Sequence, residues 1–315
     1  MPRKTIQYAS ITIPDFLCVL GRIWTSSAFI LGFVCTLALP AQADSVYVVN
    51  GNNQFGTVDL GTGAFQQIGP NTPEGEAGLV QASNGSLLTL TYSGNLDSIN
   101  PTTGITTVIG PTSLGDCSSP ASSCGPNSAS ALAALGGTIY ATDFANNLYR
   151  VDALTGKATL IGPTGIPAVP FRPGAMNPDG SFNFFDAGLF SVNGRLYTTF
   201  DAGTFNPVSS VNTPVIAPNL YQIDPSTGGA TLVGPTDLGL DALVYVNGAV
   251  YAFNDVTSQV VTLNVANGNT SFVSNFDPAA GVIDGAAATP EPGSIALVVF
   301  GMIGLAVYRR RRRAV

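Results

Sequence analysis

Residues 220–236 read LYQIDPSTGGATLVGPT, and the prediction of the fold starts from this segment because the chain repeats it. Residues 148–164 read LYRVDALTGKATLIGPT, and residues 96–112 read LDSINPTTGITTVIGPT. A fourth copy occupies residues 55–70, and a more diverged fifth copy occupies residues 260–276. In each copy, apolar and polar residues alternate on both sides of a Thr-Gly or Asn-Gly pair, as expected of two strands with one buried face. Each copy therefore predicts a β-hairpin.

The turn of each hairpin has a regular composition. An Asp or Asn ends the first strand and can accept hydrogen bonds from backbone N–H groups further round the turn. A glycine follows four residues later, where a positive φ carries no Cβ clash. The glycines stand at 63, 104, 156, 228 and 268, so the spacings are 41, 52, 72 and 40 residues. A unit of 40 or 41 residues, lengthened twice, is typical of a four-stranded propeller blade.

Two further strands precede each hairpin. They meet at two-residue turns such as Asn193-Gly194 and Asn247-Gly248, which are hairpin signals. The first copy lacks its first strand and opens at residues 45–49, whereas residues 282–288 resemble the missing strand. The sequence therefore predicts an all-β, five-bladed β-propeller, closed by a C-terminal strand that joins the first blade, and it resembles propellers of the lectin or sensor type. A β-sandwich or an open solenoid is the alternative.

Residues 1–43 have the features of a secretory signal peptide. Basic residues come first, an apolar run of 12 residues follows at 28–39, and Ala41-Gln42-Ala43 fits a small-x-small cleavage pattern. Twelve apolar residues are too few to cross a bilayer, which disfavours a retained anchor. We expect an N-terminal signal helix, export of the chain, and a repeat domain over residues 44–288.

Export bears on the cysteines. Cys117 and Cys124 remain after removal of the signal, within GDCSSPASSCGP. A local disulfide is expected between them in an oxidising compartment. A metal site is the alternative, but the chain has no histidine and would offer only two thiols, so we expect none.

The charge balance restricts the partners. Residues 44–289 hold four basic and 17 acidic residues, a net charge of −13. Nucleic acid and anionic lipid are poor partners for such a surface, whereas cations, neutral sugars or a basic protein are compatible with it. Solubility alone can also account for the charge.

Four acidic residues share one register at the start of the first strand of a blade, where the strands of a propeller line the central channel. They are Glu76, Asp186, Asp241 and Asp284, and Ser130 takes the fifth place. Such carboxylates can cap their own turns or bond the backbone of the next blade. They can also hold Ca²⁺, which prefers several oxygen ligands, or act as paired acids on a glycan. The first reading is the leading expectation, and no other cofactor is expected.

Two stretches interrupt the repeat. Residues 165–185 are rich in Pro, Gly and Phe, and residues 202–219 are rich in Pro, Ser and Asn. Both are expected to be long loops, the places where a rigid scaffold often carries function. The aromatic side chains are expected to pack onto the blade, with sugar stacking as the alternative.

The C-terminal residues 289–315 form three consecutive parts. Pro290-Glu291-Pro292 comes first, the apolar or small residues 294–308 follow, and five arginines end the segment: Arg309, Arg310, Arg311, Arg312 and Arg313. The tail resembles the PEP-CTERM sorting signal of bacteria that secrete extracellular polysaccharide. The resemblance implies recognition of Pro290, Glu291 and Pro292 by an exosortase. It also implies a C-terminal transmembrane helix that is held transiently in the inner membrane of a Gram-negative-type cell, with the arginines stopping transfer.

Two functions follow from these features. The first is a non-enzymatic cell-surface or extracellular-matrix protein, reached through the secretion machinery, whose propeller binds polysaccharide or another envelope component. The second is a secreted glycoside hydrolase that uses the acids of the channel mouth. The chain lacks histidine and a G-x-S-x-G motif, which removes the common nucleophile–base pairs and makes the first function the expectation.

Overall fold

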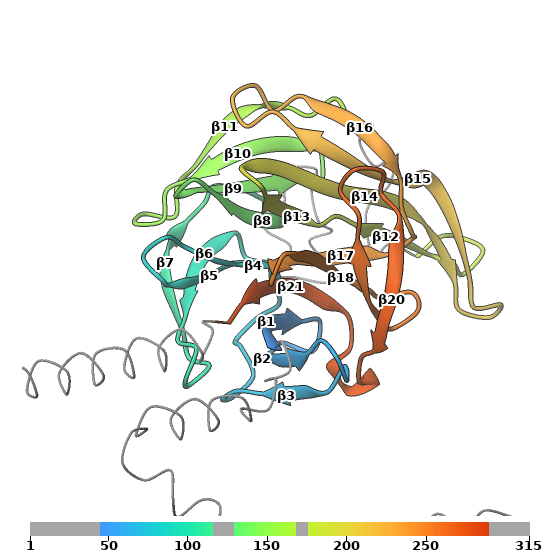
Figure 1. The fold of residues 1–315 in the computed structure, drawn as a ribbon, viewed down its shortest axis with the longest axis horizontal. Helices are drawn as coiled ribbons and strands as arrows, with labels where there is room; N and C mark the ends of the chain where they lie inside the picture. The colour runs from blue at the N-terminus through green and yellow to red at the C-terminus, as the bar shows by residue number, and fades with distance from the viewer. Residues whose placement is uncertain (1–44, 116–128, 168–175, 290–315) are drawn as a thin grey trace, which may run out of the picture. The chain divides into compact units, whose positions relative to one another are not determined.

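The computed structural model describes residues 45–115, 129–167 and 176–289, and this part of the chain is almost entirely β-structure. It forms five antiparallel sheets, one for each blade (Figure 1). Blade one contains β1 (Ser45–Asn50), β2 (Gln54–Asp59), β3 (Phe65–Gln67) and β21 (Ile283–Ala288). Blade two contains β4 (Glu76–Gln81), β5 (Leu87–Thr91), β6 (Asn95–Ile99) and β7 (Thr106–Pro111).

The other three blades follow in chain order. Blade three contains β8 (Ala129–Leu135), β9 (Thr138–Asp143), β10 (Asn147–Val151) and β11 (Ala158–Pro163). Blade four contains β12 (Phe182–Asp186), β13 (Leu189–Val192), β14 (Arg195–Asn206), β15 (Val211–Ile223) and β16 (Ala230–Pro235). Blade five contains β17 (Leu240–Val246), β18 (Ala249–Asn254), β19 (Gln259–Leu263) and β20 (Thr270–Asn275), and a short 3₁₀ helix, Pro278–Ala280, precedes β21. The five-bladed propeller is confirmed.

The last strand closes the ring. β21 pairs antiparallel with β1, with Tyr47 opposite Ala287, and lies beside it in Figure 1. The Thr289 hydroxyl donates to the Ser45 carbonyl at 2.7 Å and fixes the end of the pairing. The first strands of neighbouring blades contact one another in the cycle β21, β4, β8, β13, β17 and back to β21. The predicted closure is therefore confirmed, and the ring removes the open sheet edges at its ends.

The hairpin turns form as their composition predicts. In blade three, the Asp152 carboxylate accepts hydrogen bonds from the backbone N–H groups of Leu154 and Thr155. Gly156 has φ +78°, and a Cβ on it would overlap the carbonyl oxygen of Gly110 in β7. The turn glycine thus meets two demands: a left-handed backbone and close contact with the outer strand of the preceding blade.

Apolar side chains fill the spaces between blades. One cluster joins Val46 and Val58 of blade one to Val244 and Phe253 of blade five, with Ile283 of the closing strand among them. All five are buried. Because these contacts cross from sheet to sheet, a single blade leaves its apolar faces in water and needs its neighbours.

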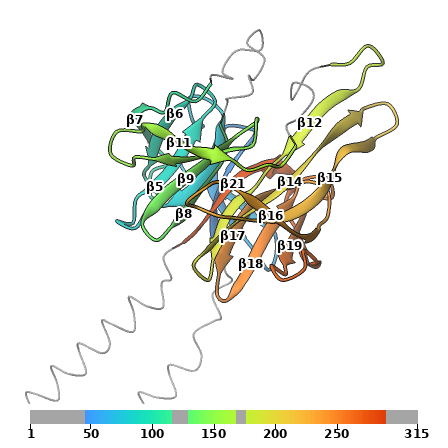
Figure 2. The ribbon, with the colours of Figure 1, turned by 90° about the horizontal axis from the view of Figure 1, so that it is seen from above.

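Residues 202–219 were expected to be a loop, and this expectation is wrong. Strands β14 and β15 continue through this stretch as a long hairpin, which extends beyond the other blades (Figure 2). β15 pairs with β16 from Asn219 onward, and the Pro218 carbonyl accepts a hydrogen bond from the Thr236 N–H at 3.1 Å. Between Val211 and Ala217, no partner on the outer side of β15 lies in the described part of the chain. Proline lacks an N–H group and is tolerated on such an edge, so Pro214 and Pro218 do not end the strand.

Residues 165–185 are only partly a loop. β12 begins at Phe182 and pairs with the extension of β14. Asp186 therefore ends β12 rather than opening the first strand of blade four, which is β13. Phe185 packs edge to face against Phe144 and Phe200, so this aromatic ring packs down onto the sheet as expected.

Several predictions concern residues outside the described ranges. These are the signal peptide at 1–43, Cys117 and Cys124, the sorting motif Pro290 to Pro292, and the apolar segment with its five arginines. They stay predictions. Within the described ranges, the structure has no helix with the length and apolar character needed to cross a membrane.

Candidate functional site

The first strands of the blades line the propeller axis, as the sequence predicts. They leave a space of only about 10 Å³. The lining residues come from all five blades and are mostly small or apolar: Gly78, Leu79, Ala131, Leu132, Ala187, Leu189, Asp241, Ala242, Leu243, Asp284, Gly285 and Ala286. Such a space has room for about one water molecule, so the axis is a packed core and not an open pore.

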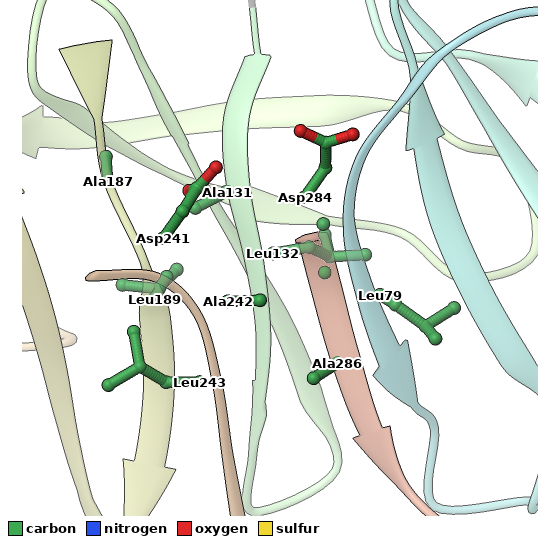
Figure 3. A pocket seen from close by; sticks show the side chains of 12 residues that line it. Leu79, Ala131, Leu132, Ala187, Leu189, Asp241, Ala242, Leu243, Asp284 and Ala286 are labelled. Atoms are coloured by element: carbon green, nitrogen blue, oxygen red, sulfur yellow. The ribbon is translucent and has the colours of Figure 1, made fainter. Parts of the chain in front are cut away.

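Of the described residues, only two charged ones line this axial space. Asp241 and Asp284 place their carboxyl groups at one end of it, while Leu243 and Ala286 lie toward the other end (Figure 3). We call this acidic end the channel mouth.

The other predicted acids lie near the channel mouth. The negative charges of Asp186 and Asp284 both act on Asp241, and the charge of Asp284 acts on Glu76. The structure therefore brings the four predicted carboxyls within electrostatic range of one another. Ser130 takes the fifth place, where its hydroxyl is 3.0 Å from that of Thr142.

Three residues that the sequence analysis missed belong to the same group: Tyr92, Asp201 and Asp255. The charges of Asp284, Asp241 and Glu76 act on the Tyr92 phenol. Asp255 accepts a hydrogen bond from the Ile283 N–H at 3.1 Å. Asp201 pairs across the sheet with Asp186. Tyr92 and Asp255 come directly after the second strand of their blades, and Asp201 holds the corresponding position within β14. This shared register is the sequence signal from which the three residues could have been predicted.

Some of these carboxyls have a clear structural role. Asp201 Oδ2 accepts a hydrogen bond from the Gly239 N–H at 2.9 Å, which ties blade four to the start of blade five. Glu76 Oε2 accepts one from the Thr89 hydroxyl at 2.8 Å. Of the four predicted acids, Asp241 makes the expected hydrogen bond to the backbone of the neighbouring blade, at Ala187 of blade four. Asp201 and Asp255, which the sequence did not predict, bond the backbone of the next blade through one oxygen each and leave the other oxygen unpaired.

Burial and mutual repulsion raise the pKa values of the whole group. Burial raises the pKa of Glu76 to about 8, despite the Thr89 hydrogen bond. Burial raises the pKa of Asp284, and the charge of Asp186 adds to the effect. Burial also raises the pKa of Asp241, and the charges of Asp186, Asp255 and Asp284 raise it further. Among the described residues, no Lys or Arg side chain opposes these effects. The channel mouth therefore carries uncompensated negative charge or holds protons.

Several carboxyl oxygens at the channel mouth are buried without a hydrogen-bond partner. They are Glu76 Oε1, Asp201 Oδ1, Asp255 Oδ2 and Asp284 Oδ2. Glu76 is fully buried, and Asp201 is 3% exposed. Over the described part of the chain, no three acidic side chains are close enough together to hold a metal ion by themselves. Any ion here therefore needs further ligands from the backbone or water.

A second candidate site lies between blades four and five, away from the axis. It is a groove of about 310 Å³, which we call the Tyr245 groove. Tyr245 is 40% exposed. Polar side chains line the groove beside it, namely Asn193, Thr262, Asn264, Asn269 and Ser271. An exposed aromatic ring among amides and hydroxyls is suited to a ligand with both apolar faces and hydroxyl groups.

Comparison with known proteins gives no family. No family model matches the chain, and no curated protein is similar to it in sequence.

Solved structures of similar shape are distant. One is a nidogen/laminin complex chain, with 13% identity, 78% of this chain and 97% of that chain covered, and a TM-score of 0.44. Glutaminyl cyclase from Myxococcus xanthus has 15% identity, coverage of 72% and 74%, and a TM-score of 0.32. Virginiamycin B lyase from Staphylococcus aureus has 13% identity, coverage of 72% and 69%, and a TM-score of 0.32. These comparisons assign no family, and the five-bladed β-propeller is established by the five sheets of the structure itself.

Proposed function

We propose that the chain is an exported, non-enzymatic protein of the cell surface or extracellular matrix, and that its propeller binds a neutral polysaccharide in the Tyr245 groove. The signal-like residues 1–43 and the sorting-signal-like residues 289–315 support export. An exosortase and the secretion machinery are the partners that these end segments imply.

The observation that carries the binding function is the composition of the Tyr245 groove. An aromatic ring exposed on a rigid sheet can stack on the apolar face of a sugar at little entropic cost. The side chains of Asn193, Asn269 and Thr262 supply amide and hydroxyl groups beside the ring. A volume of about 310 Å³ lies at the lower end of the range for ligand sites, enough for one or two sugar rings.

The charge of the mature chain favours a neutral ligand. With a net charge of −13 over residues 44–289, an anionic polymer would be repelled over long range. A neutral polysaccharide meets no such repulsion.

A glycan array tests this proposal. The full chain, purified in detergent, is expected to bind a subset of neutral glycans. Tyr245→Ala should weaken that binding about tenfold or more, because it removes the stacking ring. Phe272→Ala is the matched control, since Phe272 is also an exposed aromatic side chain of blade five but does not line the groove. Equal loss in both variants, or no glycan bound at all, would contradict the proposal.

The alternative function is a secreted, carboxylate-dependent glycoside hydrolase. The paired carboxyls of Asp186 and Asp201 favour it, because burial raises the pKa of both and the charge of Asp186 raises that of Asp201 further. Release of reducing sugar from a bound polysaccharide, abolished by Asp186→Asn, would support the hydrolase. Saturable binding without product would support the binding protein, and Asp186→Asn should then leave the affinity unchanged.

A further inference from the structure

We infer that the channel mouth binds one Ca²⁺ ion, held between Asp241 and Asp284 at the axial space. This site lies apart from the Tyr245 groove and does not depend on the proposed polysaccharide. The inference rests on the size of the space, the oxygens that face it, and the charge around it.

The axial space matches a single ion. Its volume of about 10 Å³ holds one atom or one water molecule, and it is too small for a sugar or an organic cation. Asp241 and Asp284 are the two lining residues with polar side chains, and the other lining residues are small or apolar residues of the five blades. A ligand at this place is therefore small and has oxygen neighbours.

Unpartnered oxygens give the second and independent observation. Asp284 Oδ2 has neither an accessible surface nor a hydrogen-bond partner. Glu76, which is fully buried and lies within electrostatic range of Asp284 and Tyr92, also keeps an oxygen without a partner. Leaving a buried polar atom unpaired costs about 1–3 kcal/mol, so the unpaired Asp284 oxygen, whose residue lines the axial space, calls for an unseen partner.

The surrounding charge identifies that partner as a cation. Asp186 and Asp255 lie within electrostatic range of the Asp241–Asp284 pair, and Glu76 and the Tyr92 phenol lie within range of Asp284. Asp201 is the cross-strand neighbour of Asp186. No described basic side chain offsets this charge. An anion or a hydroxyl donor would leave it unbalanced, whereas a divalent cation neutralises two carboxylates directly.

The donor set selects Ca²⁺ among cations. Every donor at the channel mouth is an oxygen, and the described part of the site offers no nitrogen or sulfur ligand. Ca²⁺ takes six to eight oxygens in flexible geometry and accepts backbone carbonyls and water, as a site with only two close carboxylates requires. Mg²⁺ demands a stricter octahedron and keeps its water, so it fits less well.

Thermal unfolding of the full chain in detergent tests the inference. After treatment with EDTA, the protein at pH 7.5 is titrated with CaCl₂ or MgCl₂. Saturating Ca²⁺ should raise Tm by about 5–10 °C, and Mg²⁺ should raise it less. The combined variant Asp241→Asn, Asp284→Asn should lose the response. It should also melt above the calcium-free wild type, because the change removes unpaired buried charge.

Asp224→Asn is the matched control. It removes one carboxylate from a hairpin turn in which Asn100 and Asn264 fill the same place in other blades, so the turn stays intact. This variant should keep the full calcium response. A wild type that shows no rise in Tm, or a combined variant that rises as much as the control, would overturn the inference.

Terbium luminescence decides the matter if the combined variant does not fold. Tb³⁺ takes the oxygen sites of Ca²⁺ and is excited by a nearby tyrosine. We expect tyrosine-sensitised emission that CaCl₂ displaces, and a loss of most of the emission in Tyr92→Phe. If Ca²⁺ does not displace the bound Tb³⁺, or if Tyr92→Phe leaves the emission unchanged, the proposed calcium site is wrong. Glycan binding that persists in EDTA would show that the Tyr245 groove works without calcium at the channel mouth, so the two proposals can fail separately.

Discussion

At the scale of the residue, two kinds of position are set by backbone and burial: the turn glycines and the buried acids. Each of the turn glycines has a positive φ, and a Cβ on it would overlap backbone in, or just after, the outer strand of the preceding blade. The sequence predicted the first demand from the Asp-x-x-x-Gly spacing. It could not predict the second, because close approach between blades is a property of the assembled ring.

Gly156 tests both demands together. Gly156→Ala should lower the free energy of unfolding by about 3 kcal/mol, because alanine is strained at φ +78° and its Cβ overlaps the Gly110 carbonyl. Gly194→Ala is the control, since Gly194 has φ +74° and a Cβ added there would meet no atom within 4 Å. It should cost only about 1 kcal/mol. Urea denaturation measures both, and equal losses would remove the packing part of the argument.

Asp97 gives a pH prediction outside the channel mouth. Burial raises its pKa from 3.8 to about 6, with the charge of Glu74 adding to the effect. The folded state thus holds this proton more tightly than the unfolded chain does. Its contribution to stability is therefore full below about pH 4 and is lost as pH rises to about 6.

Asp97→Asn should flatten that part of the pH profile. At pH 7.5 the variant should be more stable than the wild type by about 1–2 kcal/mol, because the buried carboxylate is gone. At pH 4 the two proteins should be nearly equal. Urea denaturation at pH 4, 5, 6 and 7.5 follows the difference, and a constant difference at every pH would show that the effect is not a titration.

At the scale of the element, the hairpins were predictable and the extension of blade four was not. The alternation of residues 220–236 and of its copies gives strands directly. Residues 202–219 contain Pro, Ser and Asn, which indicate a loop, yet they form the long β14–β15 hairpin because its outer side is an edge. The sequence shows which residues disfavour a strand. Only the fold shows where a missing N–H group has no partner to lose, so that proline is tolerated.

The same edge leads to a prediction about self-association. Two prolines lack N–H groups in this part of β15: Pro214 on the exposed edge, and Pro218 at the point where Thr236 begins to cover it. Replacing both by valine should restore a complete row of donors and drive edge-to-edge association, visible as a concentration-dependent rise in mass by light scattering. Thr213→Val adds a similar apolar side chain without a new N–H group, and it should leave the mass unchanged. Association of both variants to the same extent would point to surface hydrophobicity instead.

At the scale of the whole molecule, closure by the terminal strand was readable in the sequence, whereas the full acid group was not. Residues 282–288 resemble a missing first strand, and β21 fills that place. Glu76, Asp241 and Asp284 were found by their shared register. Asp201, Asp255 and Tyr92 were not predicted, because they belong to the second strands of their blades or follow them. Their proximity to the first-strand acids arises only when the blades assemble into a ring.

Removal of the closing strand tests the ring as a unit. A chain that ends at Gly281 should lose cooperative unfolding, because β1 then keeps only β2 as a partner strand and the core shared by blades one and five is opened. A chain that ends at Thr289 keeps β21 and the Thr289–Ser45 hydrogen bond and should unfold in one transition. Calorimetry compares the two, and a single sharp transition in the shorter chain would show that the ring does not need β21.

The pairing of β21 with β1 also orders events in time. β1 can pair with β2 at once, but its other edge meets a partner about 240 positions later, as the Thr289–Ser45 bond with its separation of 244 shows. That edge must therefore stay open until nearly all of the chain is available. Until then, the ring of blades remains open between β1 and β21. When β21 pairs with β1, the two ends of the propeller, Ser45 and Thr289, lie next to each other. Any anchor attached beyond residue 289 would therefore hold the propeller at the place where its ring closes.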